Sequence, residues 1–285
     1  MHFWAWFPFS LVSLLCFGFS SAFAKMPGVK GHSRHANIFW QYVAGSVLAI
    51  AFFWSRWGEI DTRTLLLGAL WGSCIAILNM FQMYGLTHID THTLFPVGTT
   101  GSLIVTILAG LSFFNESLSW QQAAGIGLTV FAVYSFLYQR GSFRFQRIML
   151  AVLPVIILLS AFGKIVQKIG VDEGDIGVFL IVGYGSGAAV ALLIMFFVEG
   201  RRVKDEIFSS AMRWGILNGA LGFAGSWAIM TALERGPFTL ITSIHSMYIF
   251  AAALIAHFFL GEQLRRKTVG LIALSIVAVV LMRMH

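Results

Sequence analysis

Charged residues are scarce in this chain. Only 11% of its 285 residues are Asp, Glu, Lys or Arg, whereas 58% are hydrophobic and the mean hydropathy is +0.82. A soluble globule of this length needs far more polar side chains to cover its surface. The composition therefore excludes an ordinary soluble domain and predicts an all-α polytopic membrane protein.

Cysteine is almost absent as well. Cys16 and Cys74 each lie within an apolar run, and neither has a cluster of His, Asp or Glu close to it in the sequence. A disulfide framework or a zinc site needs ligands at characteristic short spacings. We interpret both cysteines as small packing residues, and we expect no metal ion and no cofactor.

A contiguous basic patch is also missing, although the formal net charge is +7. The Lys and Arg residues stand in short loops between apolar runs, so we expect no nucleic-acid partner. Such residues orient helices and meet anionic lipid head groups. Most of them follow the first, fifth, seventh and ninth apolar runs, which would place both termini outside the cytoplasm.

Long apolar runs are what the chain has in abundance. Runs of about 20 residues are long enough to cross a bilayer. We predict ten transmembrane helices, at 3–24, 38–55, 64–85, 93–114, 121–137, 148–169, 178–198, 214–233, 238–260 and 268–284. The first run ends in Ala22-Phe23-Ala24, which mimics a signal-peptidase site, but it lacks a basic leading region and is kept as a helix.

One sequence motif occurs twice. In each copy an apolar run ends near two adjacent phenylalanines, a single glutamate follows, and a glycine stands in the next run at the same distance from the phenylalanines. Only the glutamate is displaced, by one position. The copies read Phe113-Phe114-Asn115-Glu116-Ser117-Leu118 with Gly125, and Phe258-Phe259-Leu260-Gly261-Glu262-Gln263-Leu264 with Gly270.

Small residues repeat at a similar interval. Gly68 and Gly72 in the third run recur 147 positions later as Gly215 and Gly219 in the eighth. Duplication of a five-helix unit explains both repeats. Because five is odd, the second copy must enter the bilayer from the opposite face. We predict two inverted repeats, covering 1–140 and 141–285.

Glu116, Glu262, Gly125 and Gly270, together with the glycine-rich third and eighth runs, give the chain a resemblance. It resembles the ten-helix branch of the drug/metabolite transporter superfamily, which has two EamA-type repeats. The resemblance implies a multi-pass protein of a bacterial inner membrane with both termini in the cytoplasm, in contrast to the charge distribution. Asn115 departs from the usual Gly-Glu, and the fourth and ninth runs lack the mid-helix proline of many relatives.

Polar side chains at membrane depth are the candidate substrate contacts, because such groups usually have a partner or a function. They occur in four runs, which we expect to wall one central cavity. The alternatives are hydroxyls bonded to their own helix, amides that join helices, and tryptophans that only pack. The candidates are Trp71, Asn79, Gln82, Thr99, Thr100, Ser102, Asn218, Ser226, Trp227, His245, Ser246 and Tyr248.

Four charged or titratable residues have specific predicted roles. His245 is a candidate for proton coupling, because imidazole titrates near neutral pH. Lys164 would either extend to the interface or contact an anion. Glu116 and Glu262 are predicted structural residues that cap the start of the following helix.

The expected function is secondary transport of a small metabolite by alternating access, in the direction of export. An amino acid, a nucleobase or nucleoside, or an amphipathic drug-like compound would suit an aromatic, weakly polar cavity. The alternative is a flippase for a lipid or lipid-linked intermediate. Titratable groups are too scattered for an enzyme, and no nucleotide-binding motif is present. We expect a monomer or homodimer in contact with membrane lipids.

Overall fold

The computed structural model describes residues 5–23, 33–59, 61–88, 91–138, 148–200, 207–209, 211–261 and 266–283. Nearly all of these residues are helical, and the described ranges contain no strand. The prediction of an all-α membrane protein is confirmed. The predicted boundary at 140 and 141 lies outside the described residues, as does Glu262.

Each of the ten predicted spans corresponds to a helix or a helix pair. The first half comprises α1 (Trp6–Phe23), α3 (Arg34–Phe53) with the 3-10 helix η1 (Trp54–Glu59), α4 (Thr62–His88), α5 (Thr91–Ser112) and α6 (Trp120–Tyr138). The second comprises α7 (Met149–Glu173), α8 (Ile176–Glu199), α10 (Ala211–Arg235), α11 (Phe238–Ser246) with α12 (Tyr248–Leu260), and α13 (Arg266–Arg283).

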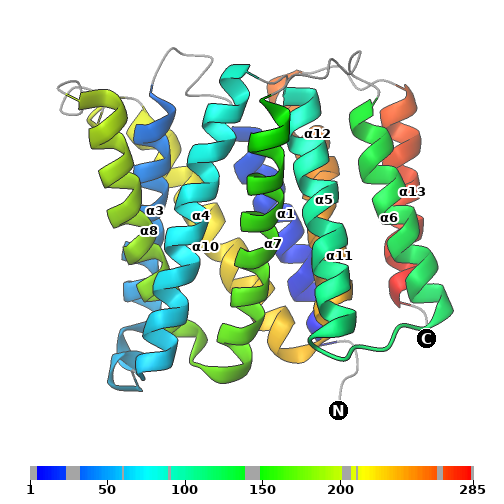
Figure 1. Cartoon of the computed structure of the whole chain (residues 1–285), viewed down its shortest axis with the longest axis horizontal. Coiled ribbons are helices and arrows are strands. Elements are labelled where there is room, and N and C mark those ends of the chain that lie inside the picture. The colour runs from blue at the N-terminus through cyan, green and yellow to red at the C-terminus, as the bar shows by residue number, and fades with distance from the viewer. Residues whose placement is uncertain are drawn as a thin grey trace.

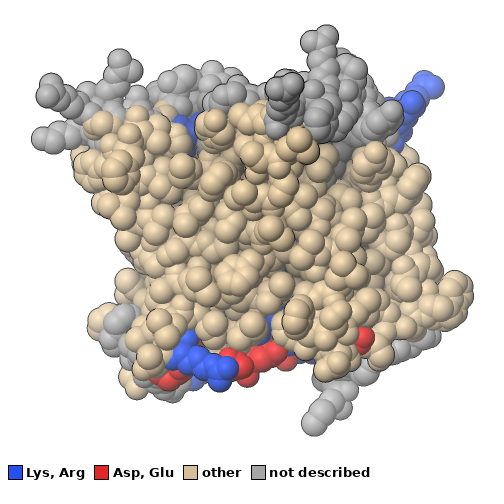
Figure 2. Space-filling view, in the orientation of Figure 1, with Lys and Arg blue, Asp and Glu red and all other residues tan. Residues whose placement is uncertain are grey.

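The helices stand side by side in one bundle, and α1 begins on the side where α13 ends (Figure 1). In the described part of the chain, seven helices are long and apolar enough to cross a membrane by themselves, and the apolar part of α5 is shorter. On the face shown in Figure 2, the described charged residues lie at the two ends of the bundle and leave an uncharged middle. This arrangement is typical of a membrane-spanning bundle.

The centre of the bundle repeats one packing contact in both halves. Gly72 of α4 lies against the carbonyl of Gly183 in α8, and Gly219 of α10 lies against the carbonyl of Gln41 in α3. A Cβ atom at either glycine would collide with backbone, so neither position accepts a side chain. The glycines are 147 positions apart and the carbonyls 142, so the two halves exchange the same contact. The equivalent helices α4 and α10 run in opposite directions (Figure 1).

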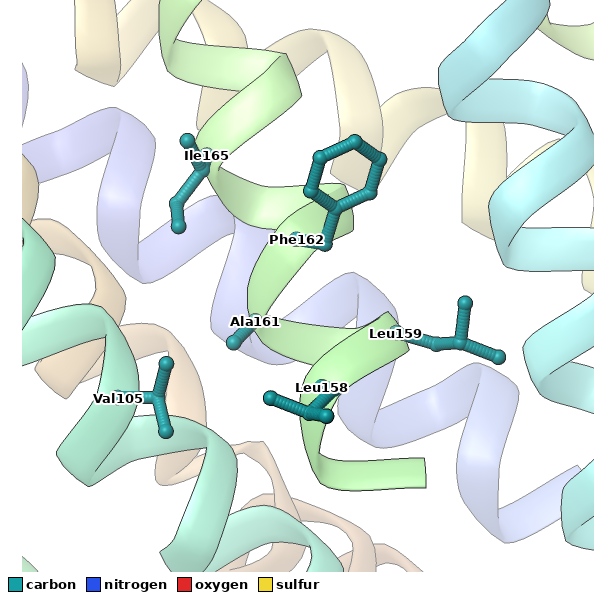
Figure 3. A pocket seen from close by; sticks show the side chains of 6 residues that line it. All are labelled: Val105, Leu158, Leu159, Ala161, Phe162 and Ile165. Atoms are coloured by element: carbon teal, nitrogen blue, oxygen red, sulfur yellow. The ribbon is translucent and has the colours of Figure 1, made fainter. Parts of the chain in front are cut away.

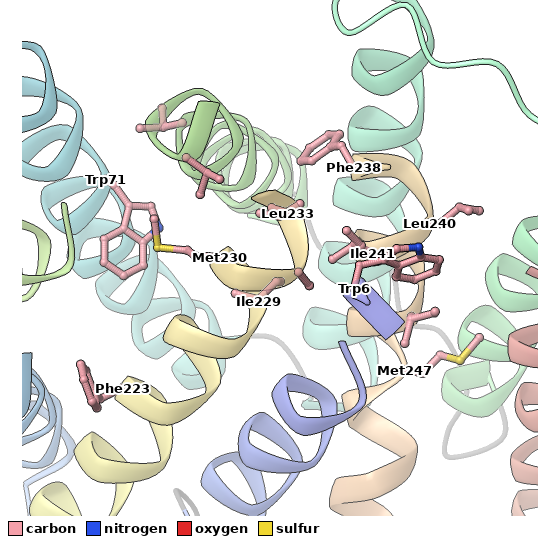
Figure 4. Packing of buried hydrophobic residues seen from close by; sticks show 14 of the residues in the cluster. Trp6, Trp71, Phe223, Ile229, Met230, Leu233, Phe238, Leu240, Ile241 and Met247 are labelled. Carbon is pink, nitrogen blue, oxygen red and sulfur yellow. The ribbon is translucent and has the colours of Figure 1, made fainter. Parts of the chain in front are cut away.

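The hydrophobic core lies where the two halves meet. Trp71 of α4, Met230 and Leu233 of α10, Phe238 of α11 and Trp6 of α1 all contribute to it (Figure 4), and each is buried. Hydrophobic side chains on the outside of the bundle are exposed instead, as expected for a surface that faces lipid.

The end of α5 explains the displaced glutamate. Asn115 has a positive φ of 50°, and Gly261, after α12, has a φ of 69°. In both copies the glutamate comes directly after this left-handed residue. Asparagine tolerates a positive φ better than most residues, so Asn115 takes the place of the usual glycine.

The ninth span is divided at Met247, whose φ of −77° and ψ of −2° interrupt the helix. Before it, three hydroxyls bond to carbonyls of their own helix: Thr242 to Phe238 at 2.8 Å, Ser243 to Thr239 at 2.7 Å, and Ser246 to Ser243 at 2.7 Å. Such bonds compete with the helical ladder and bend helices. The break therefore forms without a proline.

Candidate functional site

His245 lies directly before the break between α11 and α12. Its Nδ1 is 3.1 Å from the hydroxyl oxygen of Ser13 in α1. The ring of Phe17, one turn further along α1, meets the imidazole edge to face with centroids 4.8 Å apart. Across the break, the Tyr248 ring centroid lies 5.6 Å away. The imidazole is thus held by groups from two spans.

Two further helices reach this position. The hydroxyl of Tyr248 is hydrogen-bonded to Thr99 of α5, and Lys164 of α7 is close enough for its charge to act on His245. Lys164 therefore faces the interior of the bundle. We name Ser13, Thr99, Lys164, His245 and Tyr248 the His–Lys cluster; apart from the buried Ser13, all keep some accessible surface.

Lys164 has no acidic partner within the described segments. Lys168, one turn later on α7, is different: its ammonium is 2.6 Å from Asp172 and donates to the carbonyl of Leu233 at 3.0 Å. One lysine of α7 is thus paired with a carboxylate near the rim of the bundle, whereas Lys164, among the described residues, has no acidic neighbour and lies near His245.

A second polar layer lies between α3, α4, α8 and α10. Asn79 donates to the hydroxyl of Tyr42 at 3.2 Å, and the hydroxyl of Tyr184 donates to Ser226 at 3.0 Å. The tyrosines are 142 positions apart and their partners 147, so the two bonds are repeat-equivalent. The tyrosine rings are 6.1 Å apart and partly tilted.

Sequence analysis missed Tyr42 and Tyr184. Each tyrosine packs on a glycine of the other helix, Tyr42 on Gly187 and Tyr184 on Gly45. The sequence Tyr-x-x-Gly therefore occurs in both halves at the same 142-residue offset. That repeat could have identified the pair, but a tyrosine in an apolar run is not in itself a functional feature.

Several residues predicted to contact the substrate pack against other side chains or bond to their own helix instead. Trp71 packs against Phe179 and Tyr184, with ring centroids 5.5 and 5.8 Å away. Ser102 and Ser246 donate to carbonyls of their own helices. Trp227 is 40% exposed and lies edge-on against Phe9 of α1. Gln82 is half-buried, further along α4 than Asn79.

Two predicted residues are buried without partners among the described residues. Asn218 is fully buried, and neither its amide nitrogen nor its amide oxygen has a hydrogen bond; the hydroxyl of the buried Thr100 has none either. Asn218 is the repeat-equivalent of Trp71, which fills the corresponding space in the other half. A buried amide without a partner is costly, so this position favours a polar ligand group or a water molecule.

Glu116 caps a different helix from the one that sequence analysis predicted for it. Its carboxylate accepts hydrogen bonds from the backbone N–H groups of Phe238 and Thr239 and from the Thr239 hydroxyl, all at the start of α11. The following helix, α6, is capped by Ser119 and Gln122 instead. The prediction for Glu116 was therefore wrong about the helix, because the left-handed Asn115 redirects the chain toward the other half.

The two predicted structural glycines differ. A Cβ atom at Gly125 would press on the carbonyl of Ala278 in α13 at 2.8 Å, whereas nothing lies within 4 Å of such an atom at Gly270. Only Gly125 is thus required for a close helix contact.

An apolar groove of about 320 Å³ lies between α5 and α7 (Figure 3). Leu158 and Phe162 in its wall are 60% and 43% exposed, so the groove is on the outside of the bundle. Its lining consists of Val105, Leu158, Leu159, Ala161, Phe162 and Ile165. Lys164 precedes the lining residue Ile165 along α7, but no residue of the His–Lys cluster is among the residues that line the groove.

Two inverted sets of membrane helices, with one helix interrupted beside buried polar groups, are typical of helical membrane transporters. The chain belongs to the EamA-like transporter family, whose model matches residues 4–138 and 147–284. Membership confirms the resemblance noted in the sequence and makes the chain a multi-pass membrane transporter of small molecules.

One solved protein crystal structure has a TM-score of 0.75 to this chain at 13% sequence identity, and the match covers 95% of this chain and 96% of that one. At this identity the likeness shows the fold alone. No curated protein sequence matches the chain.

Proposed function

We propose that the protein is a secondary transporter of a bacterial inner membrane that exports a small metabolite by alternating access. The break at Met247 carries this proposal. At Met247 the regular α-helical hydrogen bonding is interrupted: Met247 and Phe250 donate to carbonyls only three residues back, at 3.0 and 2.9 Å. Interrupted helices near the middle of a span are where transporters bind their cargo. Here the break coincides with His245 and Tyr248.

The proposed movement is a rocking of one half against the other. The glycine contacts at the centre would be the pivot, because the two backbones touch there with no side chain between them. On one face, the Glu116 carboxylate joins the end of α5 to the start of α11, which would hold that side closed. Release of this cap is the step that we expect to accompany opening there.

Cargo from three classes suits the aromatic and weakly polar surroundings: amino acids, nucleobases or nucleosides, and amphipathic drug-like compounds. The driving force would be the gradient of the cargo itself or a proton gradient coupled through His245. The charged or titratable groups facing His245 are Lys164 of α7 and Tyr248 of α12. The carrier would act as a monomer or homodimer.

Counterflow in proteoliposomes tests the proposal. Purified protein is screened for ligand-induced thermal stabilisation, and each compound that stabilises it is then tested for exchange against its labelled form. We expect exchange of at least one compound, with a pH dependence that disappears in His245→Gln and persists in Ser246→Ala. Ser246 is the matched control because its hydroxyl bonds its own helix. A pH dependence unchanged in His245→Gln would end the coupling proposal.

The alternative is a flippase for a lipid or lipid-linked intermediate, and the groove between α5 and α7 favours it. An acyl or prenyl chain could lie along Leu158 and Phe162 while a head group reaches Lys164. Substitution of Ala161 by Trp would fill the groove. Loss of polyprenyl-phosphate translocation in that variant, with soluble cargo neither bound nor exchanged by the wild type, would favour the flippase.

A further inference from the structure

We infer that the His–Lys cluster binds an anionic group of the cargo, a carboxylate or a phosphate, with Lys164 as the principal contact. This inference rests on the proposed transport function and adds the charge of the substrate to it.

The first argument is the unpaired cation. An ammonium group inside a membrane protein is expensive unless an acidic side chain or a ligand compensates it. The acidic residues of the described segments all lie at or next to helix ends, and those in described pairs contact Arg56, Arg63, Lys168 and Arg235. None pairs with Lys164. An anionic ligand is the partner that this position lacks.

The second argument is the set of donors. The ammonium of Lys164 has three N–H donors. The Ser13 hydroxyl lies 3.1 Å from Nδ1 of His245, and in the tautomer protonated on Nε2 the imidazole accepts from that hydroxyl and has a second N–H for a ligand. Two donors from different helices, α7 and α11, would suit the two oxygens of a carboxylate or those of a phosphate.

The third argument is the apolar frame. The rings of Phe17 and Tyr248 both lie next to the imidazole, and Ile165, which follows Lys164, lines the apolar groove. A small anion with an aromatic or aliphatic body would fit this frame better than a fully polar one. The cluster contains no acidic side chain for an ammonium, so a simple carboxylate should bind better than a cation of the same shape.

The test is a charge series on one molecular shape. The full-length protein is placed in nanodiscs of zwitterionic phosphatidylcholine, and binding of 3-phenylpropionate, 3-phenylpropanamide and 3-phenylpropylamine is measured by calorimetry. We expect the carboxylate to bind roughly 10- to 100-fold more tightly than the amide, the range of one charged hydrogen bond. Equal affinity for the carboxylate and the amide would overturn the inference.

Variants test whether Lys164 causes the preference for the carboxylate. Lys164→Met should remove the preference for the carboxylate, and Lys164→Arg should retain most of it. Lys168→Met is the matched control, since that lysine is already paired with Asp172, and it should leave the preference unchanged. A preference that survives in Lys164→Met would place the anion elsewhere. If Lys164→Met does not fold, the wild-type charge series and Lys164→Arg still test whether the cluster prefers an anion.

Two sources of the anion are distinguished by a second arm. Binding of polyprenyl phosphate, with no binding of 3-phenylpropionate, would place the anion on a lipid and support the cluster within the flippase alternative. Counterflow of neutral or cationic compounds that is identical in wild type and Lys164→Met would overturn the anion site and leave the transport function standing. Absence of counterflow for every compound would count against the transporter itself.

Discussion

The two halves agree in one region of the molecule and differ in another. Where α3, α4, α8 and α10 meet, contacts occur twice: Gly72 and Gly219 lie on equivalent carbonyls, and Tyr42 and Tyr184 bond equivalent partners. Where α1, α5, α7 and α11 meet, the chemistry occurs once. The duplicated region therefore holds the fold together, and the unduplicated region carries the candidate site.

Equivalent positions make the difference concrete. Lys164 corresponds to Ser21 by the offset that relates Phe19 to Phe162, and His245 corresponds to the stretch of α5 that contains Thr99 and Thr100. The ninth span is divided into α11 and α12, whereas its equivalent in the first half, α5, is one continuous helix. After duplication, close backbone packing left little freedom at the glycine contacts, whereas the polar positions could diverge.

The largest loss of stability is expected when a side chain is added at the glycines of the duplicated region. Gly72→Ala should prevent folding or cost more than the ~1–3 kcal/mol typical of an overpacked core, because the Cβ atom would meet backbone that cannot move aside. Gly219→Ala should behave alike. Fluorescence-detected size exclusion and thermal unfolding check this. Gly127→Ala is the control, with nothing within 4 Å of the added atom; equal loss in all three would refute the argument.

The next effect concerns the joint between the halves. Glu116→Gln should destabilise the protein by about 1–2 kcal/mol, since a neutral amide replaces the carboxylate that accepts the N–H groups at the start of α11. Thermal unfolding in detergent measures the loss. Glu234→Gln, at an exposed carboxylate near Arg235, should change the melting temperature little. A Glu116→Gln variant as stable as wild type would show that this cap does not stabilise the protein.

A smaller effect tests whether the tyrosine bonds are equivalent. Tyr42→Phe and Tyr184→Phe should each cost ~1 kcal/mol, the usual value of one buried hydrogen bond. Double-mutant cycles with Asn79→Ala and Ser226→Ala then measure each coupling. Similar coupling energies would confirm the equivalence, and a coupling near zero in one half would show that the two layers have diverged like the candidate site.

The smallest effect lies at the rim, outside both regions. Hydrogen bonds from the hydroxyl and backbone N–H of Thr64 lower the pKa of Asp61 at the start of α4. A lowered pKa in the folded state means that the ionised carboxylate stabilises the protein above its unfolded pKa, and that this is lost as pH falls through the folded pKa. The difference in melting temperature between wild type and Asp61→Asn should therefore shrink from pH 7 to pH 3. A constant difference would contradict this.

Sequence periodicity predicted the helices well because each must satisfy its own backbone in the membrane. It also predicted that His245, Asn79, Ser226 and Asn218 are polar groups in the interior of their spans. It did not predict which of them meet, because contacts between α1, α7 and α11 depend on packing rather than on spacing. The inward direction of Lys164 and the helix capped by Glu116 were undetermined for the same reason.

The sequence by itself determined the membrane class, the ten spans and the duplication, since hydrophobic length and repeated glycines are properties of the chain alone. Only the tertiary structure decided that Glu116 joins the two halves, that the ninth span breaks at Met247, and that Lys164 approaches His245. Each of these depends on side chains far apart in the sequence that come together when helices cross, and no local pattern encodes the rotation of one helix against another.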